Sequence, residues 1–341
     1  MAKKKPLTSV LVGDIGGTNT RLRLSDPSGR RVFAEQVYPS RELASFEDAA
    51  RPFLASADAP HPRVAVVGIA GPVTNGVARV TNLPWILDER ALARHLEIDR
   101  FLLKNDLVVV ARGCLAARGK AILPLTDKAP SPRGKNCAVL AAGTGLGEAK
   151  LLWDADGARH LAFGTEGGHG DFAPRSPLEI DLWHFLKARF PDHVSYERIL
   201  SGDGLGAMYD FFASRGGREP ASVRGRLLDG DRNAAIAELG LAGKHRPAVR
   251  AVDLFATLYG AEAGNMALRE LAMGGVFLAG NIARHILPSR RDLFMTAFLE
   301  KGRFAALLSQ VPVAVVDDPF IGVRGAAAFA RDVLSPEPAK P

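Results

Sequence analysis

The chain has little of what marks several classes of protein. It holds only two cysteines, Cys114 and Cys137, which are too few for a disulfide framework or for a cysteine-based zinc site. No apolar run approaches the roughly 18 residues that a membrane span needs. No apolar segment follows the lysines of residues 1–6, as it would in a signal peptide. We therefore expect a cytoplasmic protein, in a reducing compartment, that has no membrane partner.

The basic residues do not gather in one place either. The formal net charge is +7, but neither a helix–turn–helix pattern nor a stripe of aromatic and basic residues is present, so we expect no nucleic-acid partner. A mild positive field also favours an anionic substrate. With 341 residues, of which 47% are hydrophobic, the chain is long enough for two domains with cores of their own.

A glycine turn between two strand patterns is the strongest local feature, in residues 11–24, LVGDIGGTNTRLRL. The apolar run 10–12 ends at Gly13-Asp14, and residues 20–24 alternate beyond the turn, which predicts strand, turn and strand. Glycines let backbone N–H groups converge on one point, and such a nest suits phosphate oxygens. Asp14 beside it is a carboxylate of the kind that manages Mg²⁺ or its water shell. An ordinary hairpin turn would explain the same residue pattern.

A second segment repeats this plan in residues 137–152, CAVLAAGTGLGEAKLL. Again an apolar run ends in a turn, Gly143-Thr144-Gly145, and again the turn leads into a strand pattern. Two such segments so far apart predict two domains built on one plan, each offering a phosphate loop to a shared cleft. Neither turn is the lysine-bearing P-loop GxxxxGK[ST]. Because both turns lead into strands, neither is the GxGxxG dinucleotide fingerprint, which opens a helix.

A pair of polar residues, Asn105-Asp106, stands between a predicted strand and a predicted helix. Residues 100–103 read as a short strand, and the apolar pattern from residue 107 is helical. An aspartate at such a junction often only caps the helix. The same position lets a carboxylate face a ligand in a cleft, as a general base must.

Residues 164–172, GTEGGHGDF, predict a flexible loop that is dense in hydrogen-bonding groups. Glutamate accepts and neutral histidine both donates and accepts, so Glu166 and His169 suit the vicinal hydroxyls of a polyol. A metal site that includes Asp171 lacks the helical HExxH frame, and a purely structural loop also fits. Further on, Ser195 predicts the start of a helix with Glu197 in its first turn, where the helix dipole alone would explain a carboxylate.

Other segments predict the frame around these residues. Periodicity predicts helices over residues 177–189 and 248–273, with Gly264 permitting close helix packing. The letters SGDGLG at residues 201–206 predict a glycine-rich break, and residues 275–279 predict a buried strand.

Six motifs together resemble the bacterial ATP-dependent glucokinases, members of the hexokinase/actin-like ATPase superfamily. They stand in the family's order from about residue 11 to residue 330: LVGDIGGTNTRLRL, LKND at residues 103–106, LAAGTGLGEA, GTEGGHGDFAP, VSYERILSGDGL and GGVFLAGNI. The resemblance implies an α/β protein with the two-domain actin-like ATPase (ribonuclease H-like) fold and an interdomain cleft. We expect a small α/β domain of residues 1–116 plus about 318–338, a large α/β domain of residues 117–317, and a frayed tail over residues 335–341.

The resemblance also implies ATP-dependent phosphorylation of glucose at the 6-hydroxyl, giving glucose 6-phosphate at the entry to glycolysis. Asp106 would be the general base. Mg²⁺ would be held mainly by ATP, with Asp14 acting through water, and no metal site of the protein's own is implied. Two cysteines cannot supply the zinc motif of the related ROK kinases. The residues implied in contacts with ATP phosphates are Gly13, Asp14, Ile15, Gly16, Gly17, Thr18, Gly143, Thr144 and Gly145. The residues implied in contacts with the sugar are Asn105, Asp106, Glu166, His169 and Glu197.

The chain departs from the family pattern at a few positions. Leu107-Val108 replace an expected Phe-Thr, Glu148 follows the Gly-Thr-Gly turn, Asp203 stands where proline is usual, and Asn281 replaces a common glycine. None of these changes removes a catalytic group. Three alternatives stay open: a kinase for another hexose, a kinase that draws phosphate from polyphosphate, and a sugar-sensing protein on the same fold without turnover. The sequence leaves a homodimer possible.

Overall fold

The computed structural model describes residues 8–80, 83–216 and 219–334, so the predicted tail over residues 335–341 lies outside it. The chain forms two compact units. The N-terminal unit comprises the described residues up to Ala117 and those from Asp318 onward, and the central unit comprises Arg118–Asp317. Within the described ranges, no helix combines the length and the apolar character that crossing a membrane requires.

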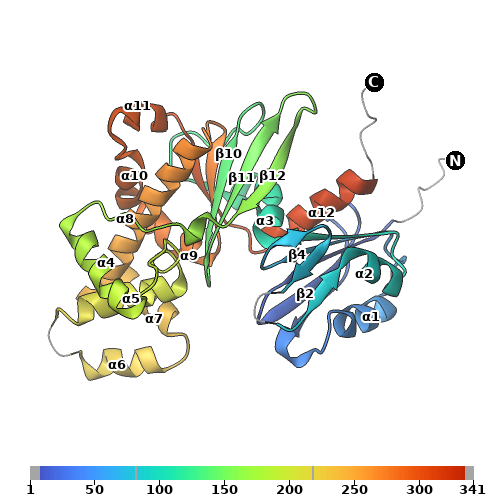
Figure 1. Cartoon of the computed structure of the whole chain (residues 1–341), viewed down its shortest axis with the longest axis horizontal. Helices are drawn as coiled ribbons and strands as arrows, with labels where there is room; N and C mark the ends of the chain where they lie inside the picture. Colours follow the sequence, from blue (N-terminus) through green and yellow to red (C-terminus); the bar gives the residue numbers. More distant parts are fainter. Residues whose placement is uncertain (1–7, 81–82, 217–218, 335–341) are drawn as a thin grey trace. The chain divides into compact units, whose positions relative to one another are not determined.

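The N-terminal unit is built on a five-stranded sheet with the order β3-β2-β1-β4-β8 (Figure 1). Strands β1, β4 and β8 are parallel, whereas β1 with β2 and β2 with β3 pair antiparallel. A small separate sheet holds β5, β6 and β7. The strands of this unit span Val10–Ile15 (β1), Asn19–Ser25 (β2), Val32–Pro39 (β3), Val64–Ile69 (β4), Val73–Thr74 (β5), Val77–Arg79 (β6), Ile86–Asp88 (β7) and Arg100–Asn105 (β8).

Both faces of the five-stranded sheet are buried, because successive side chains of a strand point to opposite faces. On β1, Leu11 joins the core that includes α1 and α2, whereas Val10 and Val12 pack with α3 and α12. Figure 1 shows the sheet between these two pairs of helices. The helices span Glu47–Ser56 (α1), Glu89–His95 (α2), Asp106–Cys114 (α3) and Ile321–Leu334 (α12).

The central unit repeats this plan in a six-stranded sheet with the order β12-β11-β10-β13-β14-β9. Strands β10, β13 and β14 are parallel, and β10 with β11 and β11 with β12 pair antiparallel. The first five strands therefore match the five of the N-terminal sheet, as the two similar glycine turns predict. The strands span Ile122–Pro124 (β9), Cys137–Ala142 (β10), Leu146–Asp154 (β11), Arg159–Thr165 (β12), Gly275–Ala279 (β13) and Val313–Val316 (β14).

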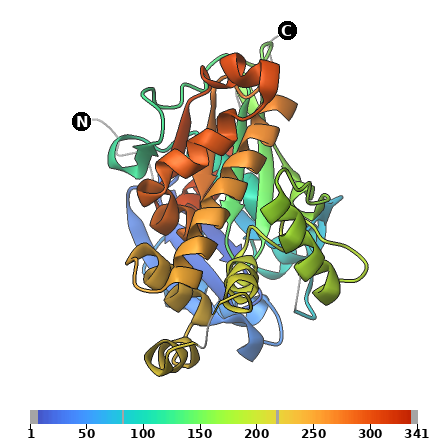
Figure 2. The same ribbon diagram turned by 90° about the vertical axis from the view of Figure 1, so that its left-hand side faces the viewer.

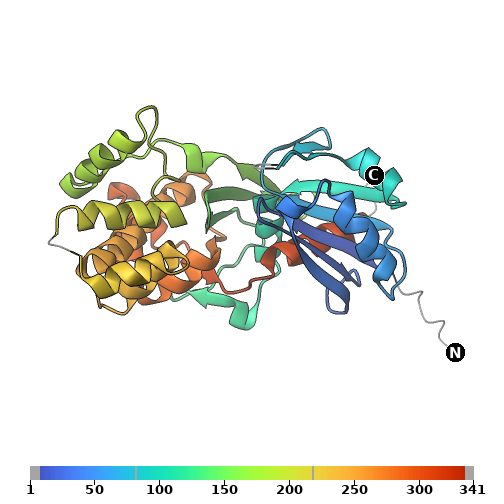
Figure 3. The ribbon, with the colours of Figure 1, turned by 90° about the horizontal axis from the view of Figure 1, so that it is seen from below.

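A long helix, α8, runs through the helical part of the central unit and packs along α10 (Figure 2). A Cβ at Gly260 would collide with the Phe294 carbonyl, and one at Gly264 would lie 2.6 Å from the Phe298 carbonyl oxygen, so the close packing predicted for Gly264 is confirmed. Helices α4 to α7 lie together at one end of this unit (Figure 3). The helices span Pro177–Arg189 (α4), Gly202–Ala213 (α5), Ala221–Leu228 (α6), Arg232–Leu241 (α7), Arg246–Arg269 (α8), Asn281–Ile286 (α9), Arg291–Leu299 (α10) and Ala305–Leu308 (α11).

Two local predictions for the central unit are wrong. Residues 201–206 form no break, because Ser201 caps α5 by accepting a hydrogen bond from the Gly204 N–H at 3.1 Å. No helix starts at Ser195, where the chain makes a turn instead. The N–H groups of the next two residues donate to the carbonyls of residues 170 and 168, and these distant partners replace the bonds of a first helical turn.

Candidate functional site

The first glycine turn joins β1 to β2 and is held by the buried Ser40. The Gly16 N–H donates to the Asn19 carbonyl at 2.9 Å, and the Ser40 N–H donates to the Thr18 carbonyl at 2.8 Å. Ser40 Oγ also donates to the Gly16 carbonyl at 2.8 Å. Among the residues that the structure describes, none accepts a hydrogen bond from the N–H groups of Gly17 and Thr18. These two donors are available to an anion, as a phosphate-binding nest requires.

Asp14 is exposed to solvent near the end of β1 and is paired across the sheet with Arg21. Protein atoms crowd the carboxylate although solvent still reaches it. This desolvation raises the pKa of Asp14, and the positive charge of Arg21 opposes the rise. An exposed carboxylate beside two backbone donors fits a site for phosphates that carry Mg²⁺.

Gly68 on β4 brings Asp14 and Asp106 together. A Cβ at Gly68 would lie 3.7 Å from Asp14 Oδ1 and 3.7 Å from Asp106 Cα. The two carboxylate-bearing residues therefore flank one glycine at the carboxyl ends of parallel strands, where α/β proteins place ligands. Sequence reasoning missed Gly68. Its only signal is a glycine inside the apolar run Val64–Ile69, since such a glycine often marks the close approach of another group.

Asn105 ends β8 and caps α3, and Asp106 is the first residue of that helix. Asn105 Oδ1 accepts hydrogen bonds from the N–H groups of Leu107 at 3.0 Å and Val108 at 3.3 Å, and Asn105 Nδ2 donates to the Gly71 carbonyl at 3.2 Å. The capping role considered for Asp106 thus belongs to Asn105. Asp106 is half-buried, and its Oδ1 accepts from the Leu107 N–H at 2.8 Å.

The second glycine turn joins β10 to β11 and lies against the start of α5. The Gly143 N–H donates to the Gly145 carbonyl at 2.8 Å, and the Gly202 N–H donates to the Gly143 carbonyl at 2.9 Å. Within the described part of the chain, no group accepts from the N–H groups of Thr144 and Gly145. The N-terminus of α5 adds positive potential here, because a helix dipole is positive at that end. This turn therefore also fits a phosphate.

The three predicted sugar residues of the central unit form one cluster. His169 Nδ1 lies 3.8 Å from Glu197 Oε1, and His169 Nε2 lies 3.9 Å from Glu166 Oε2. Glu197 Oε2 accepts a hydrogen bond from the Leu146 N–H at 3.1 Å, directly after the second glycine turn. The cluster is therefore next to the phosphate-type turn. Since Glu197 lies in a turn and not in a helix, the dipole explanation for its carboxylate is wrong.

Glycines let the loop of Glu166 and His169 approach the turn. A Cβ at Gly168 would collide with the Leu146 carbonyl, and a Cβ at Gly145 would collide with Glu197 Oε2. The Glu197 N–H donates to the Gly168 carbonyl at 2.8 Å, which ties the loop to the segment of Glu197. The sequence showed the loop's glycines but not that they are needed for this contact.

The other polar residues near the cluster have partners of their own. Asp171 Oδ1 lies 2.9 Å from His193 Nε2, and within the described residues no group of three or more His, Cys, Asp or Glu could hold a metal ion. Asp203, one of the departures, accepts from Asn233 Nδ2 at 3.3 Å. Asn281, another departure, is exposed and accepts from Arg284 Nη1 at 3.1 Å.

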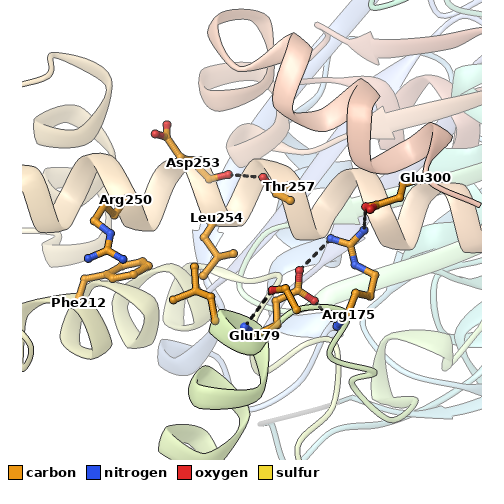
Figure 4. A pocket seen from close by; sticks show the side chains of 10 residues that line it. Arg175, Glu179, Phe212, Arg250, Asp253, Leu254, Thr257 and Glu300 are labelled. Atoms are coloured by element: carbon orange, nitrogen blue, oxygen red, sulfur yellow. Dashed lines mark hydrogen bonds and ion pairs between the residues drawn. The ribbon is translucent and has the colours of Figure 1, made fainter.

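A pocket of about 400 Å³ lies elsewhere in the central unit, along α8 (Figure 4). Arg175 donates to Glu179 at 2.9 Å and to Glu300 at 3.0 Å, and Arg250 lies over the Phe212 ring at 4.2 Å. None of the predicted site residues lines this pocket. It is therefore a feature separate from the predicted site.

The sequence comparisons with known proteins agree on one family. The glucokinase family model matches residues 11–333. The glucokinase of Nostoc sp. is 36% identical over 342 residues, which covers 95% of this chain and 99% of that relative.

Solved structures share the fold. A glucokinase from an Antarctic psychrotroph matches with a TM-score of 0.79 and 26% identity, over 94% of this chain and 98% of that one. The glucokinase from Balamuthia mandrillaris matches in fold with a TM-score of 0.79 and 23% identity, over 97% and 95% of the two chains. The predicted actin-like ATPase fold is thereby confirmed. The chain belongs to the glucokinase family, and its reaction is the ATP-dependent phosphorylation of glucose.

Proposed function

We propose that this enzyme transfers the γ-phosphoryl group of ATP to the 6-hydroxyl of glucose, with Asp106 as the general base. The observation that carries the proposal is the meeting of Asp14 and Asp106 at Gly68. Asp14 would hold the metal ion of the phosphates through water, and Asp106 would accept the proton of the attacking hydroxyl. This arrangement suits phosphoryl transfer, whose catalysis consists mostly of positioning the reactants and of neutralising charge with metal ions and hydrogen-bond donors.

The two glycine turns would bind the phosphates of ATP. Each turn presents two backbone N–H groups that have no acceptor among the described residues, namely those of Gly17 and Thr18 and those of Thr144 and Gly145. Preorganised donors of this kind stabilise the charge on a transferring phosphoryl group. Mg²⁺ bound with ATP supplies further neutralisation, and Asp14 would hold it through water.

The cluster of Glu166, His169 and Glu197 would bind glucose hydroxyls, together with Asn105. The position of Glu197 beside the second turn supports this assignment, because the hydroxyl that reacts must lie next to the phosphate. The Balamuthia glucokinase was crystallised in complex with glucose, which supports glucose as the sugar.

The proton would go to Asp106. As glucose O6 forms its bond to the γ-phosphorus, the hydroxyl proton passes to a carboxylate oxygen of Asp106. The bond from the γ-phosphorus to the bridging oxygen breaks at the same time, and ADP leaves with that electron pair. The hydrogen bonds of Asn105 to the start of α3 would fix the backbone that carries this base.

A coupled assay of ADP release with glucose and ATP tests the assignment. Asp106→Ala should lower kcat by at least about 10²-fold, the lower end for general-base catalysis. The matched control is Asp99→Ala, which removes an exposed carboxylate paired with Arg63 in the same unit and should change kcat less than about twofold. Near-normal turnover in folded Asp106→Ala would place the base elsewhere.

A panel of sugars and donors separates the remaining alternatives. Faster turnover with another hexose, or with polyphosphate, would correct the substrate. Binding of glucose without ADP release would favour a sensing protein. We also propose that the enzyme becomes more compact when sugar and ATP bind, which would exclude water from the reaction. Small-angle scattering should show compaction with glucose, and an unchanged radius of gyration would contradict this proposal.

A further inference from the structure

Glu148 is a buried carboxyl group without a donor. It lies on β11, three residues beyond the second glycine turn, and only 1% of its surface is exposed. Among the described residues, no N–H or O–H group donates to either of its carboxyl oxygens. A buried negative charge without such donors is costly in free energy, so the carboxyl group must be stabilised in another way.

The charge that acts most strongly on Glu148 is that of a second buried carboxylate, Glu262 on α8. Glu262 Oε2 accepts from Asn265 Nδ2 at 2.8 Å, and Glu262 Oε1 accepts from Arg269. Glu262 thus has the donors that stabilise a negative charge, and Glu148 has none. Two carboxylates only accept, so a contact between them becomes a hydrogen bond only when one holds a proton. Burial and the charge of Glu262 raise the pKa of Glu148 to about 7, against the attraction of Arg269.

This acid pair touches the proposed sugar site by two routes. A Cβ at Gly167 would collide with Glu148 Oε2, so the carboxyl group packs directly against the loop of Glu166 and His169. On the other side, Asn265 Nδ2 donates to Glu262 and to the Tyr196 hydroxyl, the latter at 3.3 Å. Tyr196 immediately precedes Glu197.

We infer that Glu148 and Glu262 share one proton and act as a positioning pair for glucose, holding residues 166–169 and Glu197 in their binding geometry. Loss of that proton places two negative charges against each other under the loop and weakens glucose binding. The inference rests on the proposed assignment of Glu166, His169 and Glu197 to the sugar.

Other ionisable groups also face the pair. Burial and Glu262 raise the pKa of Tyr196 to about 12, and burial raises the pKa of Tyr259, so both tyrosines stay neutral near pH 7. Burial lowers the pKa of Lys301, which lies near Glu262. The charged and titratable groups around the pair are Arg269, Glu270, Tyr259, Tyr196, Arg175 and Lys301.

The variant Glu148→Gln tests the inference, because an amide can donate to Glu262 but cannot lose a proton. If glucose binds only to the protonated pair, its apparent Kd rises by up to about tenfold per pH unit above the pKa. We expect the wild-type KM for glucose to rise at least about threefold from about pH 6.5 to about pH 8.5, with a smaller change in kcat. Glu148→Gln should keep a KM within about twofold of the low-pH wild-type value throughout. The control Glu270→Gln removes a neighbouring carboxylate and should keep the rise.

Calorimetry measures the uptake of protons on glucose binding, which would not depend on Glu148 if its role were only structural. Glucose titrated into the wild-type enzyme near pH 7.5, in buffers of different ionisation enthalpy, should show proton uptake that Glu148→Gln loses. An identical pH profile in the two proteins, or no proton uptake by the wild type, would overturn the inference. The wild-type titration decides even if the variant fails to fold. Absence of glucose phosphorylation by the wild type would instead refute the proposed function, so the two failures are distinguishable.

Discussion

The substitution Gly145→Ala should weaken glucose binding without unfolding the protein. The added Cβ would collide with Glu197 Oε2 and lie 3.2 Å from Glu197 Cδ. Only the end of a flexible side chain has to move, and the backbone of residue 145 is not in the left-handed region. We therefore expect the Tm to stay within about 2 °C of wild type.

The size of the effect follows from the contact that Glu197 loses. Its carboxylate accepts from the Leu146 N–H at 3.1 Å. Hydrogen bonds to charged groups contribute about 1.5–3 kcal/mol. The Glu197 side chain is 28% exposed, so water replaces part of that bond. We expect a net loss of about 1 kcal/mol, which raises the KM for glucose about fivefold.

The assay is the coupled release of ADP, with glucose varied at saturating ATP. The control is Gly143→Ala in the same turn, where an added Cβ would meet nothing within 4 Å. Both variants add a methyl group to the turn proposed to bind phosphate, so both can change the KM for ATP, but only Gly145→Ala should change the KM for glucose. A wild-type glucose KM in folded Gly145→Ala would refute the assignment of Glu197 to the sugar.

Three further substitutions test the position of Asp106, the packing of α8 against α10 and the protonation of Glu148. Gly68→Ala would place a Cβ 2.8 Å from Val109 Cγ2 on the helix that Asp106 begins. We expect kcat to fall about tenfold, because the proposed general base would be displaced, and an unchanged kcat would contradict this. Gly260→Ala would collide with a backbone carbonyl of α10, and calorimetry should show a Tm loss of about 10 °C, from about 3 kcal/mol of overpacking. The pKa of folded Glu148, about 7, exceeds its ordinary value of 4.5, so stability present below about pH 4.5 is lost as pH rises to about 7. Urea denaturation should show wild type losing up to about 3 kcal/mol relative to Glu148→Gln over that window, and parallel pH curves would count against it.

Periodicity and turn chemistry predicted the elements whose bonds are local. Helix α4 and strand β13 have the predicted bounds, because a serine cap with a following proline and a short apolar run between glycines specify them within the segment itself. The helix predicted at Ser195 was wrong, because the N–H groups that follow it bond to residues 168 and 170, which no local pattern shows.

In the candidate site, too, the features made of consecutive residues could be predicted, whereas those that depend on distant residues could not. The glycine turns and the junction of Asn105 with Asp106 were visible as motifs, since each is a few consecutive residues. The role of Gly68 was not, because it depends on β4 lying between two other strands. The departure at Glu148 was visible in the sequence, but its burial and the influence of the Glu262 charge depend on residues far apart in the chain.

Helix α12 makes the position of Asp106 depend on a segment that follows the central unit in the chain. It covers one face of the N-terminal sheet, and a Cβ at Gly325 would collide with the Val109 carbonyl, so it fits closely against the helix that Asp106 begins. The central unit, Arg118–Asp317, is translated before α12 and can fold while the ribosome is still at work. A nascent chain would therefore fold the loops proposed to bind the sugar first, and the helix of Asp106 would gain its support only after residues 321–334 emerge from the ribosome.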